Sequence, residues 1–204
     1  MARRLGYRFL DTGAMYRALT WAALERRLDP EDEEAMARLA VETVMDVTLP
    51  ARGSRGRGSV RVDGEDATPH LRTPAVEASV SLVSQVPEVR RRMVSLQQRL
   101  AQGRPTVMAG RDIGTVVLPD ADLKVYLEAS REERARRRCR QLGEKGSQAS
   151  FESVLEDLDR RDRLDSTRAV SPLRPATDAV IINTDGLSLE EVVEKILSLV
   201  GARR

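Results

Sequence analysis

Cysteine and histidine are nearly absent from this 204-residue sequence, which contains only Cys139 and His70. A disulfide needs two cysteines, and a structural zinc site needs several Cys or His ligands. The sequence therefore excludes an intrachain disulfide framework and a zinc-centred site. A single cysteine is also typical of proteins from a reducing compartment, and we interpret Cys139 as an incidental thiol on a helix.

Long apolar runs are missing as well. No stretch approaches the roughly 20 residues that span a bilayer, and the first segment, MARRLGYRFLD, lacks the apolar stretch of a secretory signal. We therefore expect a cytoplasmic protein without a membrane partner. Apolar residues make up 41% of the chain and charged residues 32%, a balance typical of a soluble domain with a core and room for an insertion.

Lysine is the third scarcity. Only three of the 34 basic residues are lysines, so 31 are arginines, although the net charge is only +2. The planar guanidinium of arginine binds phosphate through two parallel hydrogen bonds. A coding bias toward arginine explains the excess equally well, so position must decide which arginines bind an anion.

Short apolar runs of strand type alternate with stretches of helical period along the chain. We predict strands near Tyr7, Val107, Val125 and Ile181. Helices are predicted over residues 14–27, 33–44, 73–100 with a break near Pro87, 131–142, 151–163 and 189–199. Strands separated by helices indicate a mostly parallel sheet covered on both faces, so the predicted fold class is α/β.

A different texture follows the second predicted helix. Apolar runs at 47–49 and 60–62 flank the segment ARGSRGRGS and predict a small antiparallel meander. The basic segment suggests nucleic-acid binding, but it contains no aromatic residue on which a base could stack. We therefore favour a solvated hairpin tip.

Two predicted strand ends carry polar motifs, LDTGAMYR at 10–17 and MAGRDIGTVVLPDA at 108–121. Ligands of open α/β sheets bind beyond the carboxyl ends of the strands, where Thr12, Arg17, Arg111 and Asp112 would face one crevice. The arginines suit a phosphate, and Asp112 suits the exocyclic amine of a base. An ordinary helix cap and an Arg–Asp pair closing a loop remain alternatives.

The helix predicted over 131–142 is strongly basic. Arg134 shares a face with Arg137 and Arg138, and such a ridge of cations is typical of a polyphosphate site. The alternative is that Glu132 and Glu133 neutralise it.

The segment DRRDRLDSTRAVSPL, residues 159–173, places Arg161, Asp165 and Arg168 on one helical stripe. An acid between two arginines could accept a hydrogen bond from a ribose hydroxyl while the two arginines bind phosphate. A solvated helix with salt bridges would show the same pattern.

Together these segments resemble bacterial cytidylate kinases. DTGAMYR, GRDIGTVVLPDA, ASREERARRR and RDRLDSTRAVSPL occur in this order in that family, and VDGEDATPHLRTPAV resembles its monophosphate-binding region. The resemblance covers essentially the whole chain. It implies a P-loop kinase-type parallel sheet flanked by helices in one kinase-like domain over 1–204. Within that domain it implies an inserted monophosphate-binding region over 45–84 and a helical lid over 131–168.

The resemblance also implies an activity, transfer of the γ-phosphoryl group of ATP to CMP or dCMP with Mg²⁺, by a monomer that binds nucleotides and no nucleic acid. By match to the family, the CMP phosphate is bound by Arg17, Arg111 and Arg168, cytosine by Ser81, Arg90 and Asp112, and the phosphate and sugar by Thr12, Arg161 and Asp165; Arg134, Arg137 and Arg138 belong to the lid and act in catalysis. Thr12 stands where the family often has serine, which keeps the hydroxyl.

One feature of the family is missing. The motif G-x-x-x-x-G-K-[ST] occurs nowhere in the chain, and its backbone amides and lysine hold the β and γ phosphates in such enzymes. The segment ARRLGYRFLD reads as the tail of the helix that should follow this loop. We therefore expect a sheet without its first strand, no useful turnover, and a biological protein that begins upstream of Met1. A non-catalytic CMP-binding protein and an Arg-rich RNA-binding protein are the alternatives.

Overall fold

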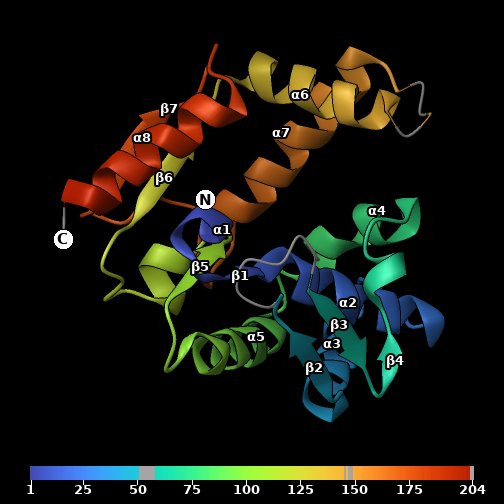
Figure 1. Cartoon of the computed structure of the whole chain (residues 1–204). Coiled ribbons are helices and arrows are strands. Elements are labelled where there is room, and N and C mark those ends of the chain that lie inside the picture. The colour runs from blue at the N-terminus through green and yellow to red at the C-terminus, as the bar shows by residue number, and fades with distance from the viewer. Residues whose placement is uncertain (51–57, 145, 147–148, 203–204) are drawn as a thin grey trace.

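The computed structural model describes residues 1–50, 58–144, 146 and 149–202, and it shows an α/β fold (Figure 1). The helices are α1 (Ala2–Leu5), α2 (Thr12–Glu25), α3 (Glu33–Glu42), α4 (Pro74–Val83), α5 (Pro87–Ala101), α6 (Arg131–Gly143), α7 (Phe151–Thr167) and α8 (Leu189–Ala202), with short turns η1 (Thr68–His70) and η2 (Ile113–Val117). The strands are β1 (Arg8–Asp11), β2 (Met45–Thr48), β3 (Ser59–Val62), β4 (Glu65–Asp66), β5 (Thr106–Ala109), β6 (Val125–Glu128) and β7 (Val180–Asn183).

The four predicted core strands are confirmed, and they form two separate parallel pairs. β1 pairs with β5 in the register Arg8 to Thr106, and β6 pairs with β7 in the register Val125 to Val180. Among the described strands no ladder joins β5 to β6, so the four strands do not form one contiguous sheet. A hollow of about 2210 Å³ lies between the two pairs and is lined by both β5 and β6.

Helix α2 is the centre of the larger core. Its side chains Met15, Leu19 and Ala23 have no exposed surface, and they pack with α3, α4 and β3. Burying a leucine side chain stabilises a fold by roughly 1.5–3 kcal/mol, so α2 is held by its surroundings. This fixes the position of whatever stands at its first turn.

The first turn of α2 is built at the tips of β1 and β5. The Asp11 carboxylate caps the helix by accepting a hydrogen bond from the Gly13 amide at 3.0 Å. The Thr12 hydroxyl donates to the Ala109 carbonyl at 3.0 Å and ties the two tips together. A Cβ atom on Gly110 would lie 2.3 Å from Thr12 Oγ1, so only glycine fits there.

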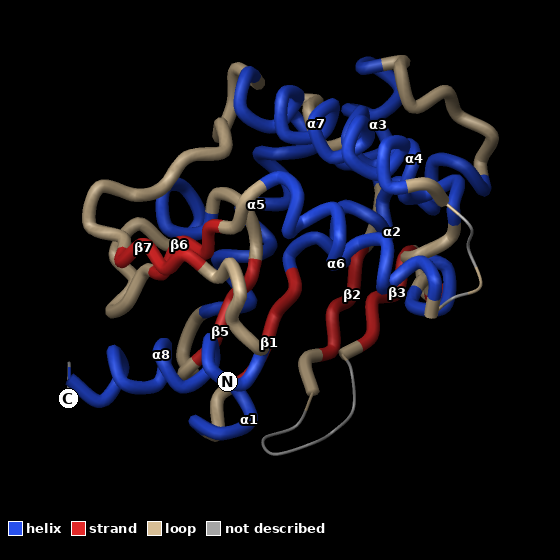
Figure 2. The backbone as a smooth tube through the Cα atoms, turned by 90° about the horizontal axis from the view of Figure 1, so that it is seen from above, coloured by secondary structure: helices blue, strands red, loops and turns tan. Residues whose placement is uncertain are grey.

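The predicted meander is confirmed in the inserted region. β2, β3 and β4 pair antiparallel in that order, with Met45 opposite Val62, and Figure 2 shows β2 and β3 side by side. The predicted hairpin tip falls largely on residues 51–57, outside the described residues. The region is joined to the core where the ring of His70 stacks on Trp21, with centroids 5.3 Å apart.

The predicted helix break at Pro87 is also confirmed, because α4 ends at Val83 and α5 starts at Pro87. The lid helices α6 and α7 pack against each other through ion pairs, Arg131 with Asp159 and Arg134 with Asp162. The lid therefore has little apolar core of its own.

Helix α8 covers β6 and β7 through Ile182, Val192 and Ile196. It begins with the capping pair that its sequence indicates, in which the Ser188 amide donates to the Glu191 carboxylate at 2.8 Å. At the other end of the chain, the helical tail predicted over ARRLGYRFLD is confirmed only for Ala2–Leu5. Gly6 follows with a left-handed φ of 66° and ends the helix, and Arg8–Asp11 form β1 instead. Within the described ranges, no helix combines the length and the apolar character that a membrane span requires.

Candidate functional site

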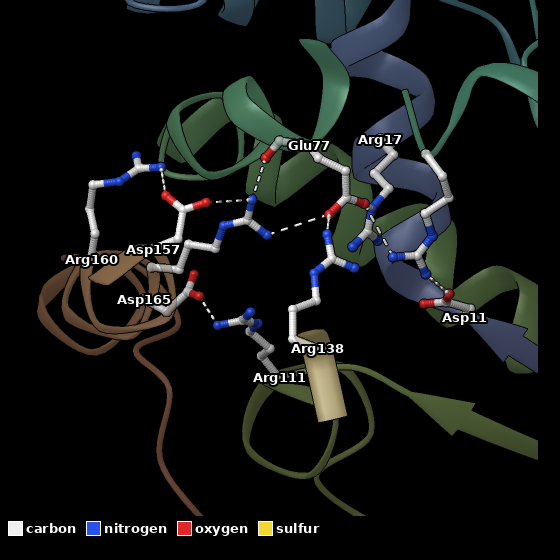
Figure 3. Close-up of polar contacts among 10 residues, drawn as sticks. Asp11, Arg17, Glu77, Arg111, Arg138, Asp157, Arg160 and Asp165 are labelled. Carbon is white, nitrogen blue, oxygen red and sulfur yellow. Dashed lines mark hydrogen bonds and ion pairs between the residues drawn. The ribbon is translucent and has the colours of Figure 1, made fainter. Parts of the chain in front are cut away.

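Three acidic side chains near the tips of β1 and β5 form ion pairs with most of the arginines proposed from the sequence as phosphate or base ligands. Glu77 stands on α4 and Asp165 on α7 (Figure 3), and Asp112 lies in the loop after β5. All three are at least 92% buried. Ionised acids at that depth require cationic partners, and each of these has at least one arginine.

Asp112 forms the deepest of these pairs, with Arg90 of α5. The two side chains are 5% and 2% exposed. Arg90 also donates to the Ser84 carbonyl at 3.1 Å, and its guanidinium lies 5.3 Å from the centre of the Tyr16 ring. Burial raises the pKa of Tyr16 to about 12 despite the charge of Arg90. The neighbouring Arg111 turns to a different acid, so the alternative of a local Arg111–Asp112 pair is not what the structure shows.

Asp165 is shared by two arginines. Arg111 contacts one carboxylate oxygen, and Arg168 donates to the other at 2.9 Å. Burial, together with the charge of Arg90, lowers the pKa of Arg168 to about 10. The Nη2 group of Arg168 is buried and has no hydrogen-bond partner within the described chain. The expected acid between two arginines is therefore present, but one of the two comes from the β5 tip.

Glu77 accepts from four arginines. Arg17 reaches it at 2.9 Å, Arg138 at 3.1 Å, Arg72 at 3.2 Å and Arg161 at 3.4 Å. Burial alone would raise the pKa of Glu77, but the charge of Arg17 and its hydrogen bond, with the other arginines, outweigh burial and lower the pKa to about 2. Glu77 is therefore ionised at any physiological pH.

This chain matches the family model described as cytidylate kinase over residues 1–202. The chain belongs to the cytidylate kinase family. Three similar curated proteins, each named cytidylate kinase, come from Pelotomaculum thermopropionicum, Desulfitobacterium hafniense and Geobacillus kaustophilus. The first is 45% identical, in a match that covers 100% of this chain and 89% of the relative. The second is 49% identical, with 98% of this chain and 84% of the relative covered. The third is 48% identical, with 100% of this chain and 89% of the relative covered. The resemblance seen in the sequence is thus confirmed, and with it a phosphotransferase family.

In this chain, the three arginines that the sequence assigns to a lid have three different partners. Arg134 pairs with Asp162 of α7. Arg137 donates to the Thr184 carbonyl at 2.6 Å and to its hydroxyl at 3.0 Å. Only Arg138 reaches Glu77. The structure therefore does not align the three as one ridge facing one anion.

The remaining expected residues fall on the same side of the molecule without meeting one partner. Thr12 is buried and bound to the β5 tip. Ser81 of α4 is buried, and its carbonyl accepts from Gln85 at 3.1 Å. Arg161 belongs to the Glu77 group and not to that of Asp165, its neighbour on the helical stripe.

Glu77 and Arg72 are the two residues of this cluster that the sequence analysis did not identify. One signal was available, because Glu77 is the only charged residue of α4, PAVEASVSLV. A lone charge in an otherwise apolar and small-residue helix indicates a buried partner.

No group of three His, Cys, Asp or Glu that could hold a metal ion occurs among the residues with described positions. Glu77, Asp112 and Asp165 are each paired with arginine.

Proposed function

We propose that this protein is of the nucleoside-monophosphate kinase type, in which the γ-phosphoryl group of ATP is transferred to CMP or dCMP to give CDP or dCDP. Because these 204 residues contain no G-x-x-x-x-G-K-[ST] motif, the role proposed for this chain is to bind and position CMP or dCMP as the acceptor, without turnover of its own. The observation that carries the proposal is the gathering of buried and half-buried arginines around Glu77, Asp112 and Asp165 at the tips of β1 and β5. The arginines outnumber these acids, so the site is electropositive where α/β folds bind ligands.

The acceptor phosphate is assigned to Arg17, Arg111 and Arg168. Arg17 uses its Nε on Glu77, and Arg111 is 46% exposed on its side chain, so both keep donors for an anion. Arg168 keeps its unpartnered Nη2. Guanidinium groups fit phosphate oxygens in pairs, and fixed cations lower the barrier of phosphoryl transfer mainly by positioning and charge stabilisation.

Cytosine is assigned to Ser81, Arg90 and Asp112. Cytosine presents an amine donor next to a ring-nitrogen acceptor, and a paired carboxylate and guanidinium present the opposite pattern. Uracil presents a carbonyl where cytosine has the amine and would face the carboxylate with an acceptor. The Arg90–Asp112 pair therefore favours cytosine.

Thr12, Arg161 and Asp165 are proposed to lie along the phosphate and sugar, and Arg134, Arg137 and Arg138 to close over ATP and act in catalysis. Mg²⁺ would neutralise charge on the phosphates of ATP, with which it binds. We place the protein in the cytoplasm as a monomer that takes nucleotides and no nucleic acid.

Calorimetric titration with CMP, dCMP, UMP, AMP, inorganic phosphate and a short RNA tests this assignment. CMP and dCMP should bind more tightly than UMP and AMP. Binding of the RNA alone would favour the RNA-binding alternative, and a preference for AMP would contradict the assignment of the base.

A further inference from the structure

Glu77 draws together parts of the chain that are far apart in sequence. It stands on α4 and accepts from Arg17 of α2, Arg72 before α4, Arg138 of α6 and Arg161 of α7. Arg161 adds a hydrogen bond to the Glu77 carbonyl at 2.8 Å. One carboxylate thus connects the core, the inserted region and both lid helices.

The charges around Glu77 do not cancel. Four guanidinium groups surround one carboxylate, and the other acids that approach them are Asp11, 3.7 Å from Arg72, and Asp157, 3.9 Å from Arg161. Both of these acids are largely exposed and screened by water. Without Glu77, the four cations would repel one another, and the lid arginines would leave α4.

Each arginine uses only some of its N–H donors in hydrogen bonds to Glu77. A guanidinium has five N–H donors, and Arg17 uses its Nε, while Arg138 uses one Nη group. Donors and net positive charge both remain for a dianion that joins the cluster. A phosphate that arrives there completes the charge balance and does not have to displace Glu77.

We propose that Glu77 is a positioning residue that closes the lid onto the inserted region before the acceptor nucleotide binds. It does so by gathering the arginines of α2, α6 and α7 around one built-in anion. The inference rests on the proposed function, because the groups that it positions include those assigned to the CMP phosphate. A lid already closed in this way spares the nucleotide the cost of assembling it.

The chain contains the two probes that a test needs. Trp21 of α2 is its only tryptophan, and Cys139 of α6 is its only cysteine. Energy transfer from Trp21 to a dansyl group on Cys139 measures the approach of lid and core. The variants are Glu77→Gln and, as matched control, Glu88→Gln, which removes an exposed carboxylate paired with Arg91 on α5.

Free Glu77→Gln should show weaker energy transfer than the parent, and free Glu88→Gln should equal the parent. Saturating CMP should restore the transfer of Glu77→Gln to the parent level, whereas cytidine, which lacks the phosphate, should not. The Kd for CMP should rise about tenfold in Glu77→Gln, because binding must now also close the lid. Glu77→Asp keeps the carboxylate on a shorter side chain, so its energy transfer and its Kd for CMP should lie between those of the parent and of Glu77→Gln.

Equal transfer in the free parent and free Glu77→Gln would overturn the proposal. So would a loss that CMP fails to restore, or that cytidine restores equally, since a merely structural ion pair would behave in that way. Should Glu77→Gln not fold, Arg138→Gln removes the same contact from the α6 side. Its energy transfer must then fall below that of the parent, and no fall would refute the role of Glu77. If the parent binds no CMP, the proposed function fails, while the free-state comparison still decides whether Glu77 holds the lid.

Discussion

Substitutions in the Arg90–Asp112 pair can distinguish a contribution to folding stability from a contribution to recognition of the base. Asp112→Asn removes the charge and leaves the Arg90 guanidinium buried without a counter-ion. The two side chains are only 2% and 5% exposed, so water does not take the place of the lost carboxylate. Removing one partner of a buried pair costs about 3–5 kcal/mol. In a protein of this size, that is a fall in Tm of about 6–20 °C.

Replacing both partners should behave differently. Arg90→Met with Asp112→Leu removes both charges and fills the space with apolar groups, and such exchanges are often neutral or stabilising. The methionine also keeps a contact with the Tyr16 ring, over which Arg90 lies. We expect the double variant to recover most of the stability that Asp112→Asn loses, but to bind CMP no better than UMP.

Thermal unfolding and calorimetric titration of the parent, Arg90→Met, Asp112→Leu and the double variant form one cycle, and Asp112→Asn is measured beside it. In a folded Asp112→Ala variant, CMP binding should weaken by about 1–3 kcal/mol, and inorganic phosphate binding should change less. An Asp112→Asn variant as stable as the parent would refute the electrostatic argument. A double variant that still prefers CMP to UMP, or an equal loss for CMP and phosphate, would show that Asp112 does not recognise the base.

Three further predictions follow from single residues. The pKa of Glu77 falls from 4.5 to about 2 on folding, so its ionisation stabilises the folded state by about 3 kcal/mol. This stabilisation is complete above pH 4.5 and is lost as the pH falls toward 2. In urea unfolding measured as a function of pH, Glu77→Gln should lack this acid-sensitive part of the unfolding free energy. Gly110→Ala should lower Tm, because its Cβ would lie 2.3 Å from Thr12 Oγ1, whereas Gly143→Ala, with open space around it, should not. In a coupled ADP-release assay, the 204-residue chain, which contains no G-x-x-x-x-G-K-[ST] motif, should not convert CMP to CDP, and turnover of about 1–100 per second would contradict the role given to that motif.

Local structure was largely predictable from the sequence because it depends on local chemistry. Pro87 lacks a backbone N–H and fits the first turn of a helix, so the division between α4 and α5 could be placed in advance. The start of α2 was predicted two residues late, at residue 14. Asp11 caps this helix through Gly13 and starts it at Thr12, and a carboxylate at the end of a strand reads equally well as a ligand.

Partners between distant elements were much less predictable. Arg161 and Asp165 are four residues apart and share a helical face, which made them a natural pair. In the structure Arg161 Nη1 lies 3.4 Å from Glu77 Oε2, and Asp165 pairs with Arg111 and Arg168. The helical period fixes which side chains share a face, but the packing of α7 against α4 decides what that face meets.

The lid shows the same limit. Successive residues of a helix point about 100° apart, so Arg137 and Arg138 leave the basic helix in different directions. Arg137 binds Thr184 at the end of β7, and Arg138 binds Glu77 of the inserted region. Helix α6 is thus held by the β6–β7 half on one side and by the acceptor side on the other. The pattern of basic residues in the sequence could identify the helix, but it could not show that neighbouring arginines contact different halves of the structure.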